Sequence, residues 1–126
     1  MHARSRRWFL SILPAATGLA AETPGKGRTF PATLHKFPDP STEFPVVRLT
    51  DPAFTAVLPQ GYNRPVAKHS NFLLLASNFT GRFEVFRMDL KNGQSRQLTE
   101  AENLAPSALA MLPEDRGFLY VDGDRV

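Results

Sequence analysis

The chain contains a stretch that occurs once in full and then begins again. Arg48-Leu49-Thr50-Asp51 is followed, at an offset of 49 residues, by Gln97-Leu98-Thr99-Glu100. The apolar run Phe72-Leu73-Leu74-Leu75 is followed, at an offset of 46 residues, by Phe118-Leu119-Tyr120-Val121. A period of about 40 to 50 residues is that of one four-stranded blade of a β-propeller. We therefore predict an all-β fold with propeller architecture.

The repeat accounts for about one complete blade and the start of a second. The chain has 126 residues and 42% hydrophobic content, which suffices for an ordinary soluble core. A closed ring, however, has roughly four to eight blades. Each blade is buried against its neighbours, so one blade and part of another leave apolar faces uncovered. We expect residues 46–126 to form part of a propeller whose remaining blades belong to a longer protein.

Residues 1–21 have the features of a signal peptide. A positive segment with three arginines precedes the apolar stretch 8–19, and within Gly18-Leu19-Ala20 small residues stand at the positions that a signal peptidase reads. The segment is too short for a stable transmembrane helix. Residues 5–10, Ser-Arg-Arg-Trp-Phe-Leu, resemble the bacterial twin-arginine export signal, and an ordinary secretory signal is the alternative. Either route predicts a periplasmic or secreted protein.

The charge balance argues against nucleic acid as a partner. The chain has 15 Lys plus Arg and 12 Asp plus Glu, and the signal contains three of the basic residues and no acidic one. The remainder is balanced at 12 against 12 and has no basic cluster that could bind phosphates. Cysteine is absent, which excludes a disulfide framework and a thiolate metal site. After signal removal we expect no membrane association.

The pattern along the rest of the chain predicts strands and turns and no amphipathic helix. Residues 22–45 are rich in Pro, Gly and Thr and indicate an exposed, extended lead-in. Val46 to Leu49 predicts a strand on the outer edge of a propeller, where an N-terminal strand often completes the last blade and closes the ring. The first full blade is expected over residues 61–99 and the second from residue 107. The predicted strands are 62–67, 72–77, 82–90 and 95–99 in the first blade, and 107–112 and 118–121 in the second.

Several segments in consistent order resemble the N-terminal portion of oligogalacturonate lyases, a family of seven-bladed propellers. The segments that carry the resemblance are Lys26 to Pro31, Asp39-Pro40, Arg48 to Thr50, Leu73 to Gly81, Gln97 to Glu100 and Pro113 to Arg116. TolB-type propellers share the Leu-Thr strand ending and a Pro-Asp-Gly-like turn. The Lys-Gly-Arg-Thr-Phe-Pro and Asp-Pro segments of the lead-in favour the lyase family over the TolB type.

The resemblance implies β-elimination of galacturonate disaccharides. In the family a divalent metal, typically manganese held by histidines and a glutamine, neutralises the uronate carboxylate while a base removes the C5 proton. Those ligands come from later blades, so no catalytic or metal-binding residue is assigned to this chain. The alternative function is a non-catalytic, TolB-like propeller that serves as a binding scaffold. This chain departs from the family's sequence pattern at Val57-Leu58-Pro59, where the lyases commonly have His-Arg-Asn. Because that polar cluster is missing, the non-catalytic alternative stays open.

Tyr62 and Arg64 are the candidate substrate-binding residues of this chain. Both are predicted at the channel-side start of the first blade. A guanidinium can bind a carboxylate through two hydrogen bonds, and a tyrosine ring can stack on a sugar. We expect an oligogalacturonide or another anionic oligosaccharide as the ligand.

Other polar residues are predicted to be structural. His69 stands where a Pro-Asp-Gly-like turn has its aspartate, so a turn role is expected. His35 has no His or carboxylate at ligand spacing, which indicates a surface position. Asp122-Gly123-Asp124 lacks the further oxygen ligands of a calcium loop and is expected to form a hairpin turn. Asn78-Phe79-Thr80 fits a turn better than a glycosylation site.

Overall fold

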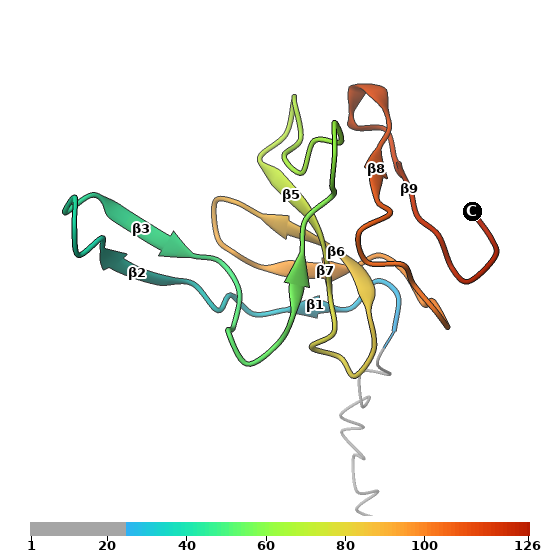
Figure 1. Cartoon of the computed structure of the whole chain (residues 1–126), viewed down its shortest axis with the longest axis horizontal. Coiled ribbons are helices and arrows are strands. Elements are labelled where there is room, and N and C mark those ends of the chain that lie inside the picture. The colour runs from blue at the N-terminus through green and yellow to red at the C-terminus, as the bar shows by residue number, and fades with distance from the viewer. Residues whose placement is uncertain (1–24) are drawn as a thin grey trace, which may run out of the picture.

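The computed structural model describes residues 25–126, so the predicted signal peptide at residues 1–21 lies outside the described residues. The described chain is all-β, with strands joined by turns and one short 3₁₀ helix (Figure 1). The elements are β1 (Thr29–Phe30), β2 (His35–Pro38), β3 (Pro45–Arg48), β4 (Ala56–Val57), β5 (Phe72–Ser77), β6 (Glu84–Asp89), β7 (Ser95–Gln97), β8 (Ala110–Met111), η1 (Pro113–Asp115) and β9 (Phe118–Leu119). Within residues 25–126 no helix has the length and apolar character needed to cross a membrane.

The central unit is a five-stranded antiparallel sheet with the order β1-β7-β6-β5-β4. Its strongest pair is β5 with β6, in register from Phe72 opposite Asp89 to Ser77 opposite Glu84. Glycines at positive φ close the flanking turns, with φ of +109° at Gly81 and +75° at Gly93. This sheet is the predicted first blade, and its second strand has the predicted bounds.

The side chains of β5 and β6 alternate between two apolar faces, as their period of two requires. One face contains Leu74, Ala76 and Val85, and the second-blade residues pack against it. The other face contains Leu73, Leu75, Phe86 and Met88, and it is partly covered by Phe30, Leu49 and Phe79 from three loops or strands. The sheet is therefore covered on both faces, as the unbroken apolar run predicts.

The innermost strand differs from the prediction of residues 62–67. β4 pairs with the end of β5, Ala56 opposite Ser77, and an isolated bridge from Val66 to Leu73 replaces the rest of the ladder. Between these two pairings the chain leaves the sheet over residues 58–65, which belong to the longer connection 58–71 between β4 and β5. Two prolines without an N–H lie in this loop, and Gly61 has a φ of +70°, so a continuous strand cannot form there.

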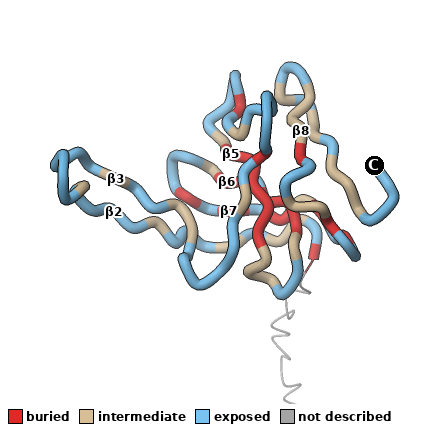
Figure 2. Tube along the Cα trace, viewed as in Figure 1, coloured by how far each residue is buried: buried red, intermediate tan, exposed pale blue. Residues whose placement is uncertain are grey.

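The lead-in also contributes strands, which its composition did not indicate. β1 pairs with β7, Thr29 opposite Arg96, so the predicted outer strand 95–99 does not form the edge of the sheet. β2 and β3 form a separate hairpin that projects from the body and is mostly exposed (Figures 1 and 2). The predicted boundary at residue 45/46 therefore falls inside a hairpin, because Pro45 pairs with Pro38.

The second unit consists of β8, η1 and β9. Ala110 lies opposite Leu119 and Met111 opposite Phe118, in a short antiparallel pair. Leu104 and Leu109 pack with Met111, Phe118 and Tyr120 against the first sheet. This arrangement is that of the inner strands of a second blade stacked on the first.

Candidate functional site

The two predicted contact residues lie on the 58–71 loop, between β4 and β5. The Tyr62 side chain is fully exposed. The Arg64 guanidinium forms an ion pair with Asp115, with 3.5 Å between Nη2 and Oδ1. The structure thus keeps both residues on the surface of one loop, and it orients Arg64 towards the second unit.

Asp115 links the two units. Its carboxylate accepts hydrogen bonds from the backbone N–H of His69 (2.7 Å) and of Lys68 (3.1 Å) as well as from Arg64. The Asp115 side chain is nearly buried. Its backbone has a φ of +56°, in the left-handed region that Asp adopts more readily than most other non-glycine residues. The backbone N–H of His69, then that of Lys68, and the nearby Arg64 charge hold the pKa of Asp115 below its ordinary value.

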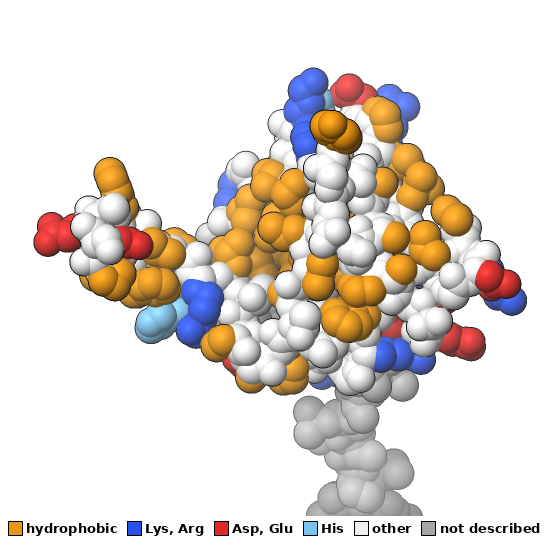
Figure 3. All heavy atoms as spheres, in the orientation of Figure 1, with side chains coloured by type: hydrophobic (Ala, Val, Ile, Leu, Met, Phe, Trp, Pro, Cys, Tyr) orange, Lys and Arg blue, Asp and Glu red, His pale blue; other side chains and the backbone are white. Residues whose placement is uncertain are grey.

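The His69 side chain makes an exposed contact with the second unit. Its Nε2 lies 3.0 Å from Oε2 of Glu114, and more than half of each side chain is exposed. The predicted turn residue therefore contacts the equivalent turn of the next blade through both its backbone and its side chain. At the top of the view in Figure 3, basic side chains and acidic ones gather over this region.

These residues do not fit a metal centre. Within residues 25–126, no three His, Cys, Asp or Glu side chains come together closely enough to hold a metal ion. The pair of His69 and Glu114 supplies one imidazole and one carboxylate, fewer ligands than a structural or catalytic metal needs. His35 is exposed on β2, where its ring stacks on Phe37 with centroids 5.8 Å apart.

Two of the predicted turns have side-chain partners that explain them. The carboxylate of Asp122 accepts hydrogen bonds from the backbone N–H of Asn103 (2.7 Å) and Glu102 (3.3 Å), and Gly123 has a φ of +64°. Oδ1 of Asn78 accepts a hydrogen bond from the backbone N–H of Thr55 (2.9 Å). Both segments are turns, as predicted.

A cavity of about 200 Å³ lies between the two units, beside the Asp115 contacts. Two of its lining residues are arginines, Arg87 on β6 and Arg116 after η1. The Arg87 guanidinium lies 4.2 Å from the centroid of the Phe72 ring, a cation–π contact. The full lining is Phe72, Leu74, Arg87, Leu98, Met111, Asp115, Arg116, Gly117 and Phe118. Guanidinium groups beside aromatic rings suit a ligand with carboxylates and sugar rings.

Sequence reasoning assigned no role in ligand binding to these two arginines. Arg87 is the exposed position of β6, where it alternates with buried residues. Its proximity to Arg116 follows from the stacking of one blade on the next, which a single sequence does not specify. Neither Tyr62 nor Arg64 lines this cavity.

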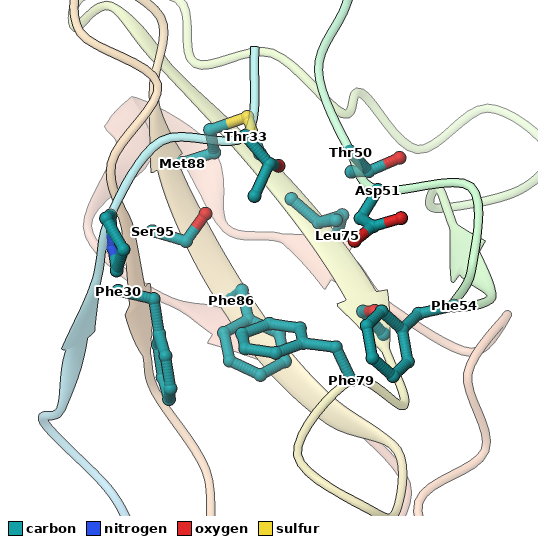
Figure 4. Close-up of a pocket in the computed structure, with 12 residues that line it drawn as sticks. Phe30, Thr33, Thr50, Asp51, Phe54, Leu75, Phe79, Phe86, Met88 and Ser95 are labelled. Atoms are coloured by element: carbon teal, nitrogen blue, oxygen red, sulfur yellow. The ribbon is translucent and has the colours of Figure 1, made fainter.

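A second cavity of about 200 Å³ lies on the other face of the first sheet. Its floor is aromatic, with Phe79 4.5 Å from Phe86 and 4.7 Å from Phe30 between ring centroids (Figure 4). Asp51 is the single charged residue of the lining, which also includes Pro31, Thr33, Thr50, Phe54, Leu75, Ser77, Met88 and Ser95. No Lys or Arg among the described residues of this lining offsets the Asp51 carboxylate, whereas two arginines accompany Asp115 in the first cavity. The second cavity would therefore repel a uronate, and its lining suits apolar packing better than an anionic sugar.

Glu84 is a buried carboxylate with a structural role. It accepts hydrogen bonds from the hydroxyl of Thr99 (2.6 Å), from the backbone N–H of Ala101 (2.9 Å) and from Nε of Arg82 (3.2 Å). Its lone pairs are thereby used to hold the chain that leaves β7 for the second unit. We assign it no part in ligand binding.

Comparisons with known proteins agree with this geometry. A family model described as oligogalacturonate lyase matches residues 24–126. The oligogalacturonide lyase of Pectobacterium atrosepticum is 30% identical over 100 residues, covering 79% of this chain and 26% of that protein. The oligogalacturonate lyase of Dickeya dadantii is 29% identical over the same length and shares.

Solved structures give the same result. An oligogalacturonate lyase in complex with manganese superposes with a TM-score of 0.72 at 28% identity, over 78% of this chain and 26% of that one. An oligogalacturonate lyase from Vibrio parahaemolyticus has a TM-score of 0.72 at 26% identity over the same shares. The chain thus spans about a quarter of the length of the relatives it matches.

Proposed function

Because this chain belongs to the oligogalacturonate lyase family, we propose that it is the N-terminal part of an exported protein that acts on pectin-derived oligogalacturonides by metal-assisted β-elimination. The observation behind this proposal is the continuous match over residues 24–126, together with the TM-score of 0.72. Relatives named as oligogalacturonide and oligogalacturonate lyases supply the substrate class.

Within this proposal, the role of the described residues is to contact the anionic sugar. Arg87 and Arg116 line the cavity between the two units, and Arg64 pairs with Asp115 of the same lining. Their guanidinium groups are available to bind uronate carboxylates. The exposed ring of Tyr62 offers a surface on which a sugar can stack. A divalent metal in the whole protein would need ligands other than those described, since residues 25–126 bring no three ligands together.

The experiment is an assay of the whole protein that contains this chain. Incubation of the whole protein with digalacturonate and manganese should release an unsaturated uronate, which is detected by its ultraviolet absorbance. Residues 1–126 alone should give no product. Arg64→Ala should raise KM about tenfold with little change in kcat, because a charged hydrogen bond to substrate is lost. Arg125→Ala, at an exposed arginine of the last turn, is the control.

The outcomes separate the two functions that the sequence left open. Product formation by the whole protein supports the lyase. Saturable binding of digalacturonate without product would identify a non-catalytic scaffold, and neither binding nor product would reject an oligogalacturonide ligand. Product from residues 1–126 alone would mean that catalytic groups lie within this chain.

Export by the twin-arginine route is the localisation that we propose. Support comes from Arg6 and Arg7, which precede an apolar stretch. Changing both to Lys should prevent delivery to the periplasm, since the twin-arginine receptor distinguishes guanidinium groups from simple positive charge. Undiminished delivery of this variant would point to the ordinary secretory route.

A further inference from the structure

The cavity between the two units carries more positive charge than the described residues around it neutralise. Two of its lining residues, Arg87 and Arg116, have no ion pair with a carboxylate among residues 25–126. Asp115 is the single acidic residue of the lining, and its carboxylate is already paired with Arg64 and with two backbone N–H groups. Two guanidinium charges therefore stay uncompensated, and an anion between them would lower their electrostatic energy.

A further arginine adds to this excess of charge. Arg96 on β7 lies directly opposite Arg87 on β6, and like charges in direct cross-strand register repel each other. Arg96 also lacks an ion pair within the part of the chain that the structure describes, and it does not line the cavity. The sheet thus contains two adjacent cations whose repulsion a bound anion would offset.

The aromatic ring of Phe72 holds Arg87 at the cavity. The guanidinium lies 4.2 Å from the ring centroid, and Phe72 is on β5, which flanks β6 on the side away from β7. The charge is therefore drawn away from Arg96 and towards the strand beside which the second unit packs (Figure 1). A cation–π contact forms no conventional hydrogen bond, so the N–H groups of Arg87 stay available for an anion.

The turn after β8 holds Arg116 on the other side of the cavity. The N–H of Leu112 donates to the carbonyl of Gly117 (2.8 Å), which closes the turn. Asp115, the preceding residue, is anchored through its carboxylate to two backbone N–H groups of the 58–71 loop. Because the backbone is held on both sides of Arg116, a ligand has less conformational freedom to remove when it binds.

The size and the apolar walls of the cavity limit the ligand to one small sugar unit. The volume of about 200 Å³ is below the roughly 300 to 1,000 Å³ of a site for a drug-sized ligand. An inorganic anion would leave the apolar walls in contact with water, whereas the C–H face of a sugar ring would cover them. These apolar walls are formed by Phe72, Leu74, Leu98, Met111 and Phe118.

We propose that this cavity binds a single uronate residue, with its carboxylate between Arg87 and Arg116 and its ring against the apolar walls. The identity of the sugar, galacturonate, rests on the proposed function. Each arginine comes from a different unit, so the bound sugar connects the two units and stabilises their contact. A neutral hexose or an esterified uronate lacks the charge, and the site therefore distinguishes the free acid from both.

The test is calorimetric titration of the whole protein with the galacturonate monosaccharide in the presence of EDTA. The monosaccharide has no glycosidic bond to cleave, and EDTA removes divalent metal, so neither turnover nor a metal-bound carboxylate contributes to the signal. Galactose and the methyl ester of galacturonate should bind at least about tenfold more weakly, because each lacks the charged acceptor. Acetate has the carboxylate without the ring, and it should also bind more weakly, because it covers less apolar surface.

Arginine variants locate the binding within the whole protein. Arg87→Gln and Arg116→Gln should each raise the Kd for galacturonate about tenfold or more, because a charged hydrogen-bond donor is lost. Arg116→Lys keeps the charge without the planar fork of donors and should give an intermediate Kd. Arg96→Gln is the matched control. It removes an exposed charge outside the lining and should change the Kd by about twofold or less, since salt screens that charge.

Every outcome bears on the proposal. Equal affinity for galacturonate and galactose, an unchanged Kd in both glutamine variants, or acetate binding as tight as that of galacturonate would overturn it. If a glutamine variant does not fold, the comparison of ligands and Arg116→Lys decide. Binding of galacturonate by a protein that forms no product from digalacturonate would reject the lyase and support this site. Product formation without binding of the monosaccharide in EDTA would do the reverse.

Discussion

The first and second units contain almost the same apolar run but bury it to very different extents. Leu73 in β5 is 7% exposed, whereas Leu119, its equivalent in β9, is 48% exposed. β5 pairs with β4 and β6 and has apolar clusters on both faces. β9 pairs with β8 alone among the described strands. The difference shows that a blade strand receives its burial from its neighbours and not from its own hydrophobicity.

The largest expected effect comes from a core truncation on each side of this comparison. Phe86→Ala should destabilise the chain by about 3 to 5 kcal/mol. The fully buried ring packs against Phe79, and its removal would leave a cavity in the core. Leu119→Ala should cost about 1 kcal/mol or less at its half-exposed site. Urea unfolding of both variants measures the difference.

Equal costs for the two truncations would contradict the comparison. They would mean that β9 is as well covered as β5 in solution, by a second copy or by rearrangement of the second unit. Repeating Leu119→Ala in the whole protein sharpens the point, since added neighbours should raise its cost towards that of a core leucine, about 2 to 5 kcal/mol.

A smaller effect is expected where the first unit holds the chain leading to the second. Glu84→Ala leaves the Thr99 hydroxyl and the Ala101 N–H without their acceptor in a buried site, at a cost of about 2 kcal/mol. Glu102→Gln, at an exposed position of the same connection, is the matched control and should change the unfolding free energy by about 0.5 kcal/mol or less. If Glu102→Gln lowers the unfolding free energy as much as Glu84→Ala does, the buried hydrogen bonds of Glu84 do not account for the loss of stability.

The parts of the fold that sequence predicted are those dictated by local pattern. The run 72–77 became β5 with its predicted bounds, and the alternation in 82–90 placed Phe86 and Val85 on opposite faces. Gly81 and Gly93 took the positive φ that their turns require. These signals lie within a few residues and do not depend on distant partners.

The missed features depend on contacts distant in sequence. β1 has two residues and no apolar alternation, and it exists because it pairs with β7. The predicted inner strand 62–67 was interrupted by backbone groups that cannot join the ladder, leaving β4 to take its place. Arg87 and Arg116 come to line one cavity only because the two units stack. The roles of Tyr62 and Arg64 stay predictions.

Acid should weaken the contact between the two units. Because backbone N–H groups lower the pKa of Asp115 below its unfolded value, its ionised form stabilises the fold above the unfolded pKa, and this contribution is lost as pH falls through the folded pKa. Thermal unfolding should therefore show the wild type losing stability below about pH 4. Asp115→Asn should lose less over that range, whereas Asp124→Asn should follow the wild type. Parallel curves for all three would remove Asp115 from the interface.

The smallest effect is expected at the hairpin that projects from the body. The backbone N–H of Thr42, then that of Ser41, lowers the pKa of Asp39, which is at the surface of the loop. Asp39→Ala should therefore speed amide exchange in the loop while it shifts the global thermal midpoint by about 2 °C or less, since the hairpin contributes little to the core. Asp89→Ala removes the equivalent carboxylate from a loop whose strands lie in the central sheet, so its midpoint shift should be larger. A larger shift for Asp39→Ala in residues 1–126 would mean that the hairpin is already part of the cooperative unit.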